Sequence, residues 1–169
     1  MKNLVILCAT CGVGKSTIKD YLNERSSLEN FVFYDIDEMG LNWHDYKNEP
    51  TGETKYSEDC LKIANHRAGD KNILFACCMN PLGYEEFTSI GDIAKTYFLN
   101  IQCSDEELYK RLKGRPKERM TDNDEFIEVQ IDYMNWFRTN THRLDYVIDN
   151  TNLTVKETSE LVENFLKTL

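Results

Sequence analysis

Near its start the chain carries the stretch that decides its fold, Leu4-Val5-Ile6-Leu7-Cys8-Ala9-Thr10-Cys11-Gly12-Val13-Gly14-Lys15-Ser16-Thr17. The apolar run Leu4 to Ala9 is typical of a buried strand. The residues after Ser16 follow an amphipathic pattern that predicts a helix. Between them, Ala9 to Ser16 has the form of a Walker A loop, called the P-loop below, and its position between a strand and a helix is the one this motif requires.

Each residue type in the P-loop has a physical reason. Glycines let backbone N–H groups turn inward around phosphate oxygens, and the following helix presents the positive end of its dipole. The lysine reaches the outer phosphates, and the serine offers a hydroxyl to Mg²⁺. We therefore predict a catalytic role for Lys15, a magnesium ligand in Ser16, and nucleotide contacts from Cys11, Gly12, Val13, Gly14, Lys15, Ser16 and Thr17.

Composition narrows the class of protein. The 169 residues include 20 Lys or Arg and 29 Asp or Glu, which gives a net charge of −9, and 41% are hydrophobic. Such a chain can bury a core, so intrinsic disorder is excluded. The acidity argues against nucleic acid as a partner and favours a small charged substrate. The length and the lack of a linker predict a single domain over residues 1–169.

The first apolar run also bears on location. Leu4 to Ala9 is too short for a signal sequence or a membrane span, so we expect a cytoplasmic protein without membrane association. The six cysteines are then expected to be free thiols. A zinc site at Cys8 and Cys11 with Cys77 and Cys78 is the weaker interpretation, because the P-loop already accounts for the first pair.

Four further apolar runs follow the first: Phe31 to Tyr34, Ile73 to Cys78, Tyr97 to Ile101 and Tyr146 to Ile148. Helical patterns separate them. Strands that alternate with helices predict an α/β fold with a parallel sheet, and continuous apolar runs predict strands that are buried on both faces. Residues 41–59 show no clear period, which predicts a loop-rich or short-helix insertion.

Two acids follow the second run. The third run ends in Met79-Asn80-Pro81 and carries no acid, so the usual Walker B carboxylate is missing. Instead, Asp35 and Asp37 stand at alternate positions where the second strand ends, so both carboxylates can face one cleft. We expect Asp35 to assist the Mg²⁺ shell. If the acceptor is an alcohol, Asp37 is expected to orient its hydroxyl and to take its proton, whereas a nucleoside monophosphate acceptor requires no base.

With these motifs in order, the sequence resembles the small-molecule kinases of the P-loop superfamily: shikimate kinase, gluconate kinase, chloramphenicol phosphotransferase and adenylate-kinase-like nucleotide kinases. The resemblance rests on residues 9–17, 35–37, 104–116 and 147–152. It implies a three-layer P-loop NTPase fold whose five-stranded parallel sheet has the order 2-3-1-4-5 and is flanked by helices. It also implies MgATP as cofactor, an acceptor-binding insertion at 38–70 and a helical lid at 104–139.

The resemblance also assigns single residues. In the family an Arg-x-x-x-Arg at the start of the lid stacks on adenine and grips the phosphates, and Arg111 and Arg115 match that spacing. Arg115 is accordingly expected to be catalytic and Arg111 to bind the nucleotide, together with Asn150 and Thr151 after the fifth strand. Two interpretations are open for Arg67: it binds a phosphate of the acceptor, or it forms an ion pair at a helix end.

These expectations define a function with open alternatives. We expect an ATP-dependent phosphotransferase, monomeric or homodimeric, that acts on a small-molecule acceptor. Aromatic Trp43 and Tyr46, with His44, favour a nucleoside or nucleotide acceptor slightly, although they can equally pack the insertion onto the core. An antibiotic or sugar-like alcohol is the alternative acceptor, and Cys77 to Gly83 lacks the glycine run that shikimate kinases carry. A non-catalytic ATP-binding regulator and a polynucleotide 5′-hydroxyl kinase are the competing classes.

Overall fold

A computed structural model describes all 169 residues. Its centre is one parallel sheet in which the strands are ordered β2-β3-β1-β4-β5. The predicted number, direction and order of the strands are confirmed, and only the ends differ by a few residues. The strands are β1 (Lys2–Cys8), β2 (Phe31–Asp35), β3 (Asn72–Cys77), β4 (Ile93–Gln102) and β5 (Tyr146–Asp149).

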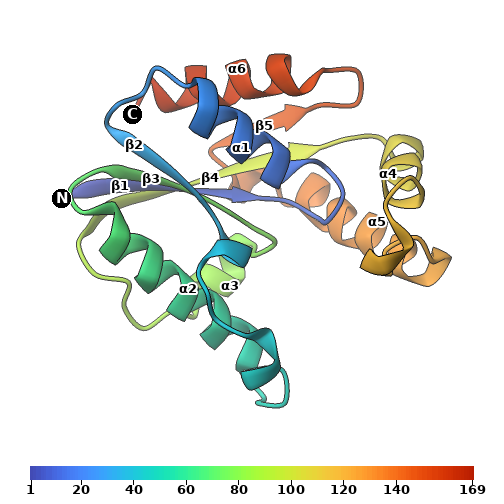
Figure 1. Cartoon of the computed structure of the whole chain (residues 1–169), viewed down its shortest axis with the longest axis horizontal. Helices are drawn as coiled ribbons and strands as arrows, with labels where there is room; N and C mark the ends of the chain where they lie inside the picture. Colours follow the sequence, from blue (N-terminus) through green and yellow to red (C-terminus); the bar gives the residue numbers. More distant parts are fainter.

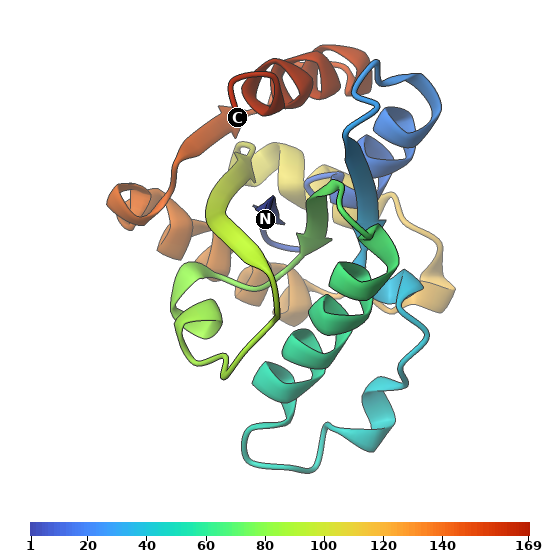
Figure 2. The same cartoon turned by 90° about the vertical axis from the view of Figure 1, so that its left-hand side faces the viewer.

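Helices cover both faces of the sheet, so the molecule has the three predicted layers (Figure 1; Figure 2). One face carries α1 (Lys15–Arg25) and α6 (Val155–Leu166), and the other carries α2 (Gly52–Ala68) and the short α3 (Pro81–Glu85). Helices α4 (Asp105–Lys113) and α5 (Asp124–Thr139) lie at the end of the sheet that carries the P-loop. Four 3₁₀ turns complete the chain: η1 (Ile36–Glu38), η2 (Trp43–Asp45), η3 (Lys117–Arg119) and η4 (Thr141–Arg143).

The two core clusters follow from the alternation of side chains along β1. Val5 and Leu7 face the layer of α1 and α6, whereas Leu4 and Ile6 face α2, and all four are fully buried. The prediction of burial on both faces therefore holds for the central strand. It is wrong for β5, whose Tyr146 is 37% exposed, because β5 is an edge strand with β4 as its single neighbour.

The predicted insertion is partly helical. Residues 43–45 form the short turn η2, as expected, but α2 begins at Gly52, so the second part of the 41–59 stretch belongs to a regular 17-residue helix. The buried positions of its first turns are Gly52, Ser57 and Glu58. These residues are not apolar, which is why no hydrophobic period marked this part of the helix.

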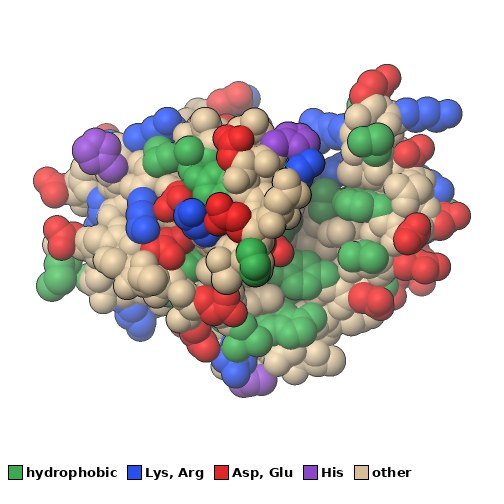
Figure 3. All heavy atoms as spheres, turned by 90° about the horizontal axis from the view of Figure 1, so that it is seen from below, with side chains coloured by type: hydrophobic (Ala, Val, Ile, Leu, Met, Phe, Trp, Pro, Cys, Tyr) green, Lys and Arg blue, Asp and Glu red, His purple; other side chains and the backbone are tan.

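The surface agrees with the acidic composition. Asp and Glu side chains gather toward the end of the molecule that carries α4 and α5 (Figure 3). No helix combines the length and the apolar character that a membrane-crossing segment needs.

Candidate functional site

The P-loop connects the carboxyl end of β1 to the first turn of α1. Gly12 and Gly14 both have a φ of 100°, a conformation that glycine adopts without strain. At Gly12 a Cβ atom would lie 2.8 Å from a methyl carbon of Leu108, so helix α4 packs directly on the loop. Lys15 Nζ donates hydrogen bonds of 2.8 Å to the carbonyls of Ala9 and Thr10. The lysine thus lies across the mouth of the loop.

Gln130 of α5 supports the loop from the side. Its Oε1 accepts a 3.0 Å hydrogen bond from the backbone N–H of Cys11 and a 2.7 Å hydrogen bond from the hydroxyl of Thr10. Sequence reasoning missed this residue, because nothing in the local pattern of α5 separates one glutamine from other polar positions. The contact ties the predicted lid region to the P-loop.

A first cavity of about 310 Å³ lies beside the P-loop. It brings together residues that are far apart in the sequence, including the predicted nucleotide residues Arg111, Arg115 and Asn150. Its walls come from the P-loop, α1, α4 and the segment around the start of α6. They are formed by Gly12, Val13, Gly14, Thr17, Ile18, Arg111, Arg115, Asn150, Leu153, Val155 and Thr158.

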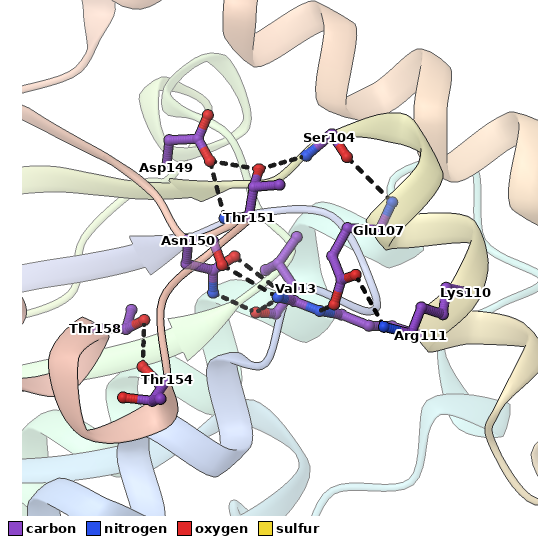
Figure 4. Close-up of polar contacts among 10 residues, drawn as sticks. All are labelled: Val13, Ser104, Glu107, Lys110, Arg111, Asp149, Asn150, Thr151, Thr154 and Thr158. Carbon is purple, nitrogen blue, oxygen red and sulfur yellow. Dashed lines mark hydrogen bonds and ion pairs between the residues drawn. The ribbon is translucent and has the colours of Figure 1, made fainter.

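Asn150 and Arg111 form the polar wall of this cavity (Figure 4). The buried Asn150 amide donates to the Val13 carbonyl at 3.0 Å, and its Oδ1 accepts from Arg111 at 3.0 Å. Glu107 accepts from Arg111 Nε at 2.8 Å, and this hydrogen bond lowers the pKa of Glu107. The guanidinium is therefore held at the edge of the P-loop by three partners, Val13, Asn150 and Glu107.

Thr151 does not line this cavity. Figure 4 shows its side chain turned toward Asp149 and Ser104. Its hydroxyl donates to the Asp149 carboxylate at 2.6 Å and accepts from the Ser104 N–H at 2.8 Å. These bonds lower the pKa of Asp149 and join the end of β5 to the start of α4. The structure thus separates Thr151 from the other predicted nucleotide residues.

A second cavity of about 340 Å³ lies between the P-loop and the end of β2. Arg115 lines both cavities, and its guanidinium is 3.1 Å from the Cys11 sulfur. Arg119, to which the sequence analysis gave no role, also lines the second cavity, and Arg115 and Arg119 repeat the Arg-x-x-x-Arg spacing. The lining residues are Cys11, Gly12, Gly14, Lys15, Ser16, Thr17, Asp20, Asp35, Ile36, Asp37, Cys77, Cys78, Arg115 and Arg119.

The two predicted carboxylates both reach this second cavity. Asp35 is the last residue of β2 and is buried, and its Oδ1 accepts from the N–H of Asp37 at 3.1 Å in the turn η1. Desolvation raises the pKa of Asp37, and the charge of Asp35 raises it further, while Lys15 and Arg119 oppose the shift. The raised pKa and the place of Asp37 in the cavity make it a candidate proton acceptor.

Arg67 of α2 fixes the same turn. Its guanidinium donates to the carbonyl oxygens of Glu38 at 3.2 Å and Met39 at 3.4 Å. The ion-pair interpretation is wrong, because Arg67 forms no ion pair and donates to backbone carbonyls instead. Tertiary packing of α2 on η1 decided this role.

A third cavity of about 250 Å³ adjoins the second at the carboxyl end of β3. Met79 and Tyr133 line it, and the Tyr133 hydroxyl donates to the carbonyl of Cys78, a residue of the second cavity. The residues around it come from α2, the β3–α3 connection, α3 and α5. They are Glu53, Thr54, Ser57, Met79, Asn80, Leu82, Gly83, Glu86 and Tyr133.

The aromatic residues of the insertion lie outside all three cavities. The rings of Trp43 and Tyr46 pack edge-on against Tyr56 of α2, with centroids 5.5 and 5.4 Å apart. The Tyr46 hydroxyl donates to Asp59 at 3.1 Å. They pack the insertion onto α2, which was the alternative to stacking on a base, and His44 is exposed.

Comparison with known proteins places the chain in a family. The sequence model of a family described as "AAA domain" matches residues 5–132, so the chain belongs to this family. The match includes the P-loop, the two acids after β2 and much of the predicted lid region. No curated protein matches the chain significantly.

Several solved structures of small-molecule kinases share the fold of this chain. Shikimate kinase from Acinetobacter baumannii, in complex with shikimate, is 16% identical over 99% of this chain and 94% of its own, with a TM-score of 0.63. Deoxyadenosine kinase from M. mycoides is 17% identical over 99% and 100%, with a TM-score of 0.58. A gluconokinase from Sinorhizobium meliloti 1021 is 16% identical over 99% and 97%, with a TM-score of 0.55. The fold expected from the P-loop kinase resemblance is thereby confirmed.

Proposed function

We propose that the protein is an ATP-dependent phosphotransferase that moves the γ-phosphate of MgATP to a hydroxyl group of a small molecule. The observation that carries this proposal is the second cavity. Lys15, Arg115 and Arg119 bring positive charge to its lining, and Asp35 and Asp37 bring carboxylates. Phosphoryl transfer needs this combination of charge neutralisation, positioning and a hydroxyl-orienting acid.

In this proposal the first cavity holds the nucleoside part of ATP, and the phosphates extend over the P-loop into the second cavity. Arg115 lines both spaces and is placed to follow the phosphate chain from one to the other. Lys15 exchanges its two carbonyl partners for phosphate oxygens when the nucleotide binds. Arg111 and Asn150 act mainly by holding the Val13 end of the loop in shape.

Ser16 and Asp35 offer the hydroxyl and carboxylate oxygens that Mg²⁺ prefers, and both line the second cavity. When bound there, the ion would neutralise charge on the phosphates. The protein supplies the remaining step: the acceptor oxygen forms a bond to the γ-phosphorus, the bond from that phosphorus to ADP breaks, and Asp37 takes the hydroxyl proton. Its raised pKa suits it to that transfer.

We also propose that residues 38–70 form an acceptor-binding insertion and residues 104–139 form a lid. Three residues of the third cavity, Glu53, Thr54 and Ser57, come from the first segment, and Tyr133 comes from the second. The cavity has no Lys, Arg or His in its lining, and Arg67 is held by backbone carbonyls. This favours a hydroxyl acceptor over a nucleotide acceptor, whose phosphate needs a cation.

A non-catalytic ATP-binding regulator is the other class. Such a protein has no use for Asp37 with a raised pKa beside a P-loop lysine, so the geometry favours the enzyme. The net charge of −9 disfavours the polynucleotide kinase alternative, because a polynucleotide acceptor needs a cationic groove.

The test is transfer of labelled γ-phosphate from ATP to a panel of nucleosides, sugars, amino alcohols and antibiotics by the parent protein, Lys15→Ala and Lys47→Ala. Lys47 is an exposed lysine away from the cavities and serves as the charge-matched control. We expect the parent and Lys47→Ala to phosphorylate an acceptor and Lys15→Ala to lose transfer while keeping its unfolding temperature. Equal transfer by Lys15→Ala would refute the assignment of the P-loop.

A further inference from the structure

We infer that the third cavity binds an acceptor that carries a protonated amine beside the hydroxyl group to be phosphorylated. This inference rests on the proposed function and names the chemical class of its acceptor. Met79 lines this cavity and its chain neighbour Cys78 lines the second one, so a small molecule bound there lies next to the space that holds Lys15 and Asp37.

The two carboxylates in the cavity lack ion-pair partners, in contrast to the acids around them. Glu58 of the same helix as Glu53 pairs with Lys62 at 2.7 Å, and Glu85, the neighbour of Glu86, pairs with Arg143 at 3.2 Å. Glu53 and Glu86 make no salt bridge. The protein thus supplies cations to these neighbouring acids, whereas the two that line the cavity have no cationic partner from the protein.

The contacts inside the cavity keep one of these acids oriented. The Thr54 hydroxyl donates to Glu86 Oε2 at 2.9 Å, which joins α2 to α3 across the cavity wall and leaves Glu86 Oε1 without a protein partner. A carboxylate held in this way can accept a charge-assisted hydrogen bond from an ammonium group without first losing side-chain freedom.

A buried polar group in the lining is an independent sign of a ligand. Ser57 is 7% exposed, lines the cavity, and its hydroxyl has no hydrogen-bond partner within the protein. Its oxygen is accessible rather than enclosed in the protein, so the hydroxyl is available to a polar ligand group in the cavity. The volume of about 250 Å³ fits a small acceptor.

The nearby cations are engaged elsewhere, which excludes anionic acceptors from the same space. Arg143 pairs with Glu85, Lys62 with Glu58, and Arg67 with backbone carbonyls. A carboxylate or phosphate in the cavity would face Glu53 and Glu86 without a counter-charge, and like charges repel. The acceptors expected to be poor are therefore sugar acids and nucleotides.

The test compares matched acceptors that differ in one group: the amine, the corresponding alcohol and the corresponding carboxylate. The scaffolds are a hexose (glucosamine, glucose, gluconate), a nucleoside with and without an amino group on the sugar, and an aromatic amino diol with its deaminated analogue. We expect the parent enzyme to phosphorylate an amine with a kcat/KM at least about tenfold above that of its uncharged analogue, the scale of one charged hydrogen bond.

Three variants test whether Glu53 and Glu86 produce the preference for amine acceptors. Glu53→Gln and Glu86→Gln should each raise the KM for the amine about tenfold and leave the KM for ATP unchanged, whereas Glu85→Gln, the control outside the cavity, should change neither. All three variants should unfold near the temperature of the parent, since Glu53 and Glu86 are exposed.

The outcomes separate the two proposals. Phosphorylation of uncharged or anionic acceptors with equal or better efficiency, or an amine preference that survives in both cavity variants, overturns the amine inference alone. If the parent transfers phosphate to no acceptor of any charge, the proposed function fails, and the inference fails with it.

Discussion

Replacing Asn150 with alanine tests how the first cavity is held in shape. The substitution removes a hydrogen bond from the buried amide to the Val13 carbonyl and a charge-assisted one from Arg111 to Oδ1. A neutral bond contributes about 0.5–1.5 kcal/mol and a charged one about 1.5–3 kcal/mol. The Val13 carbonyl keeps a 3.3 Å bond from Arg111, so it is not orphaned. We therefore expect a loss at the low end of the sum of these two contributions, about 2–3 kcal/mol in the free energy of unfolding.

The assay combines urea unfolding with ATP binding by titration calorimetry. Arg111 loses one of the partners that hold it at the cavity wall, so ATP should bind about tenfold more weakly, equivalent to about 1.4 kcal/mol. Asn152→Ala is the matched control, because Asn152 is exposed in the same loop and its side chain makes no hydrogen bond. That control should leave both measurements unchanged.

A double-mutant cycle with Arg111→Ala decides whether the two side chains act through one another. Because they contact directly, the double variant should lose less stability than the two single losses together, with a coupling of about 1 kcal/mol. A loss below about 0.5 kcal/mol in Asn150→Ala, the level of an ordinary surface change, would refute the reasoning. So would strictly additive losses in the cycle.

Three further predictions concern catalysis and acid stability. Arg115→Ala should slow single-turnover transfer about a hundredfold, the scale of one lost transition-state donor, and weaken ATP binding much less; a parent-like rate in rapid-quench measurements would make Arg115 a surface residue. Asp37→Asn should lose transfer to a hydroxyl about a hundredfold. Because the pKa of Asp37 is raised, the parent's rate should fall on acidification at a higher pH than for an ordinary aspartate, and identical pH profiles for parent and variant would exclude Asp37 as the base. Hydrogen bonds from Lys62 and Thr88 lower the pKa of Glu58 from 4.5 to about 2, so its contribution to stability is full above pH 4.5 and is lost as the pH falls toward 2. Glu58→Gln should lack this part of the acid-induced loss in thermal unfolding curves, and equal acid sensitivity of the two proteins would contradict the assignment.

Local signals in the sequence were sufficient for the fold class. The apolar runs and the helical patterns between them predicted a parallel α/β sheet, because the side-chain period of each element is set by its own backbone geometry. The family resemblance supplied the strand order, which no local pattern contains. The sequence did not predict the first turns of α2, because their buried residues are Gly52, Ser57 and Glu58. Burial of such residues depends on neighbours from elsewhere in the chain.

The sequence determined one part of the candidate site, and only the tertiary structure decided the other part. The sequence by itself determined the P-loop, since its glycines, its lysine and its serine act within a few residues of one another, and it determined that Asp35 and Asp37 stand together where β2 ends. Only the tertiary structure decided that Arg119 and Arg115 share a cavity with them, that Gln130 supports the loop, and that Arg67 is held by backbone carbonyls. The third cavity likewise exists only because α2, α3 and α5 meet at the end of β3. Contacts between distant segments depend on packing in three dimensions, and no local period or spacing encodes them.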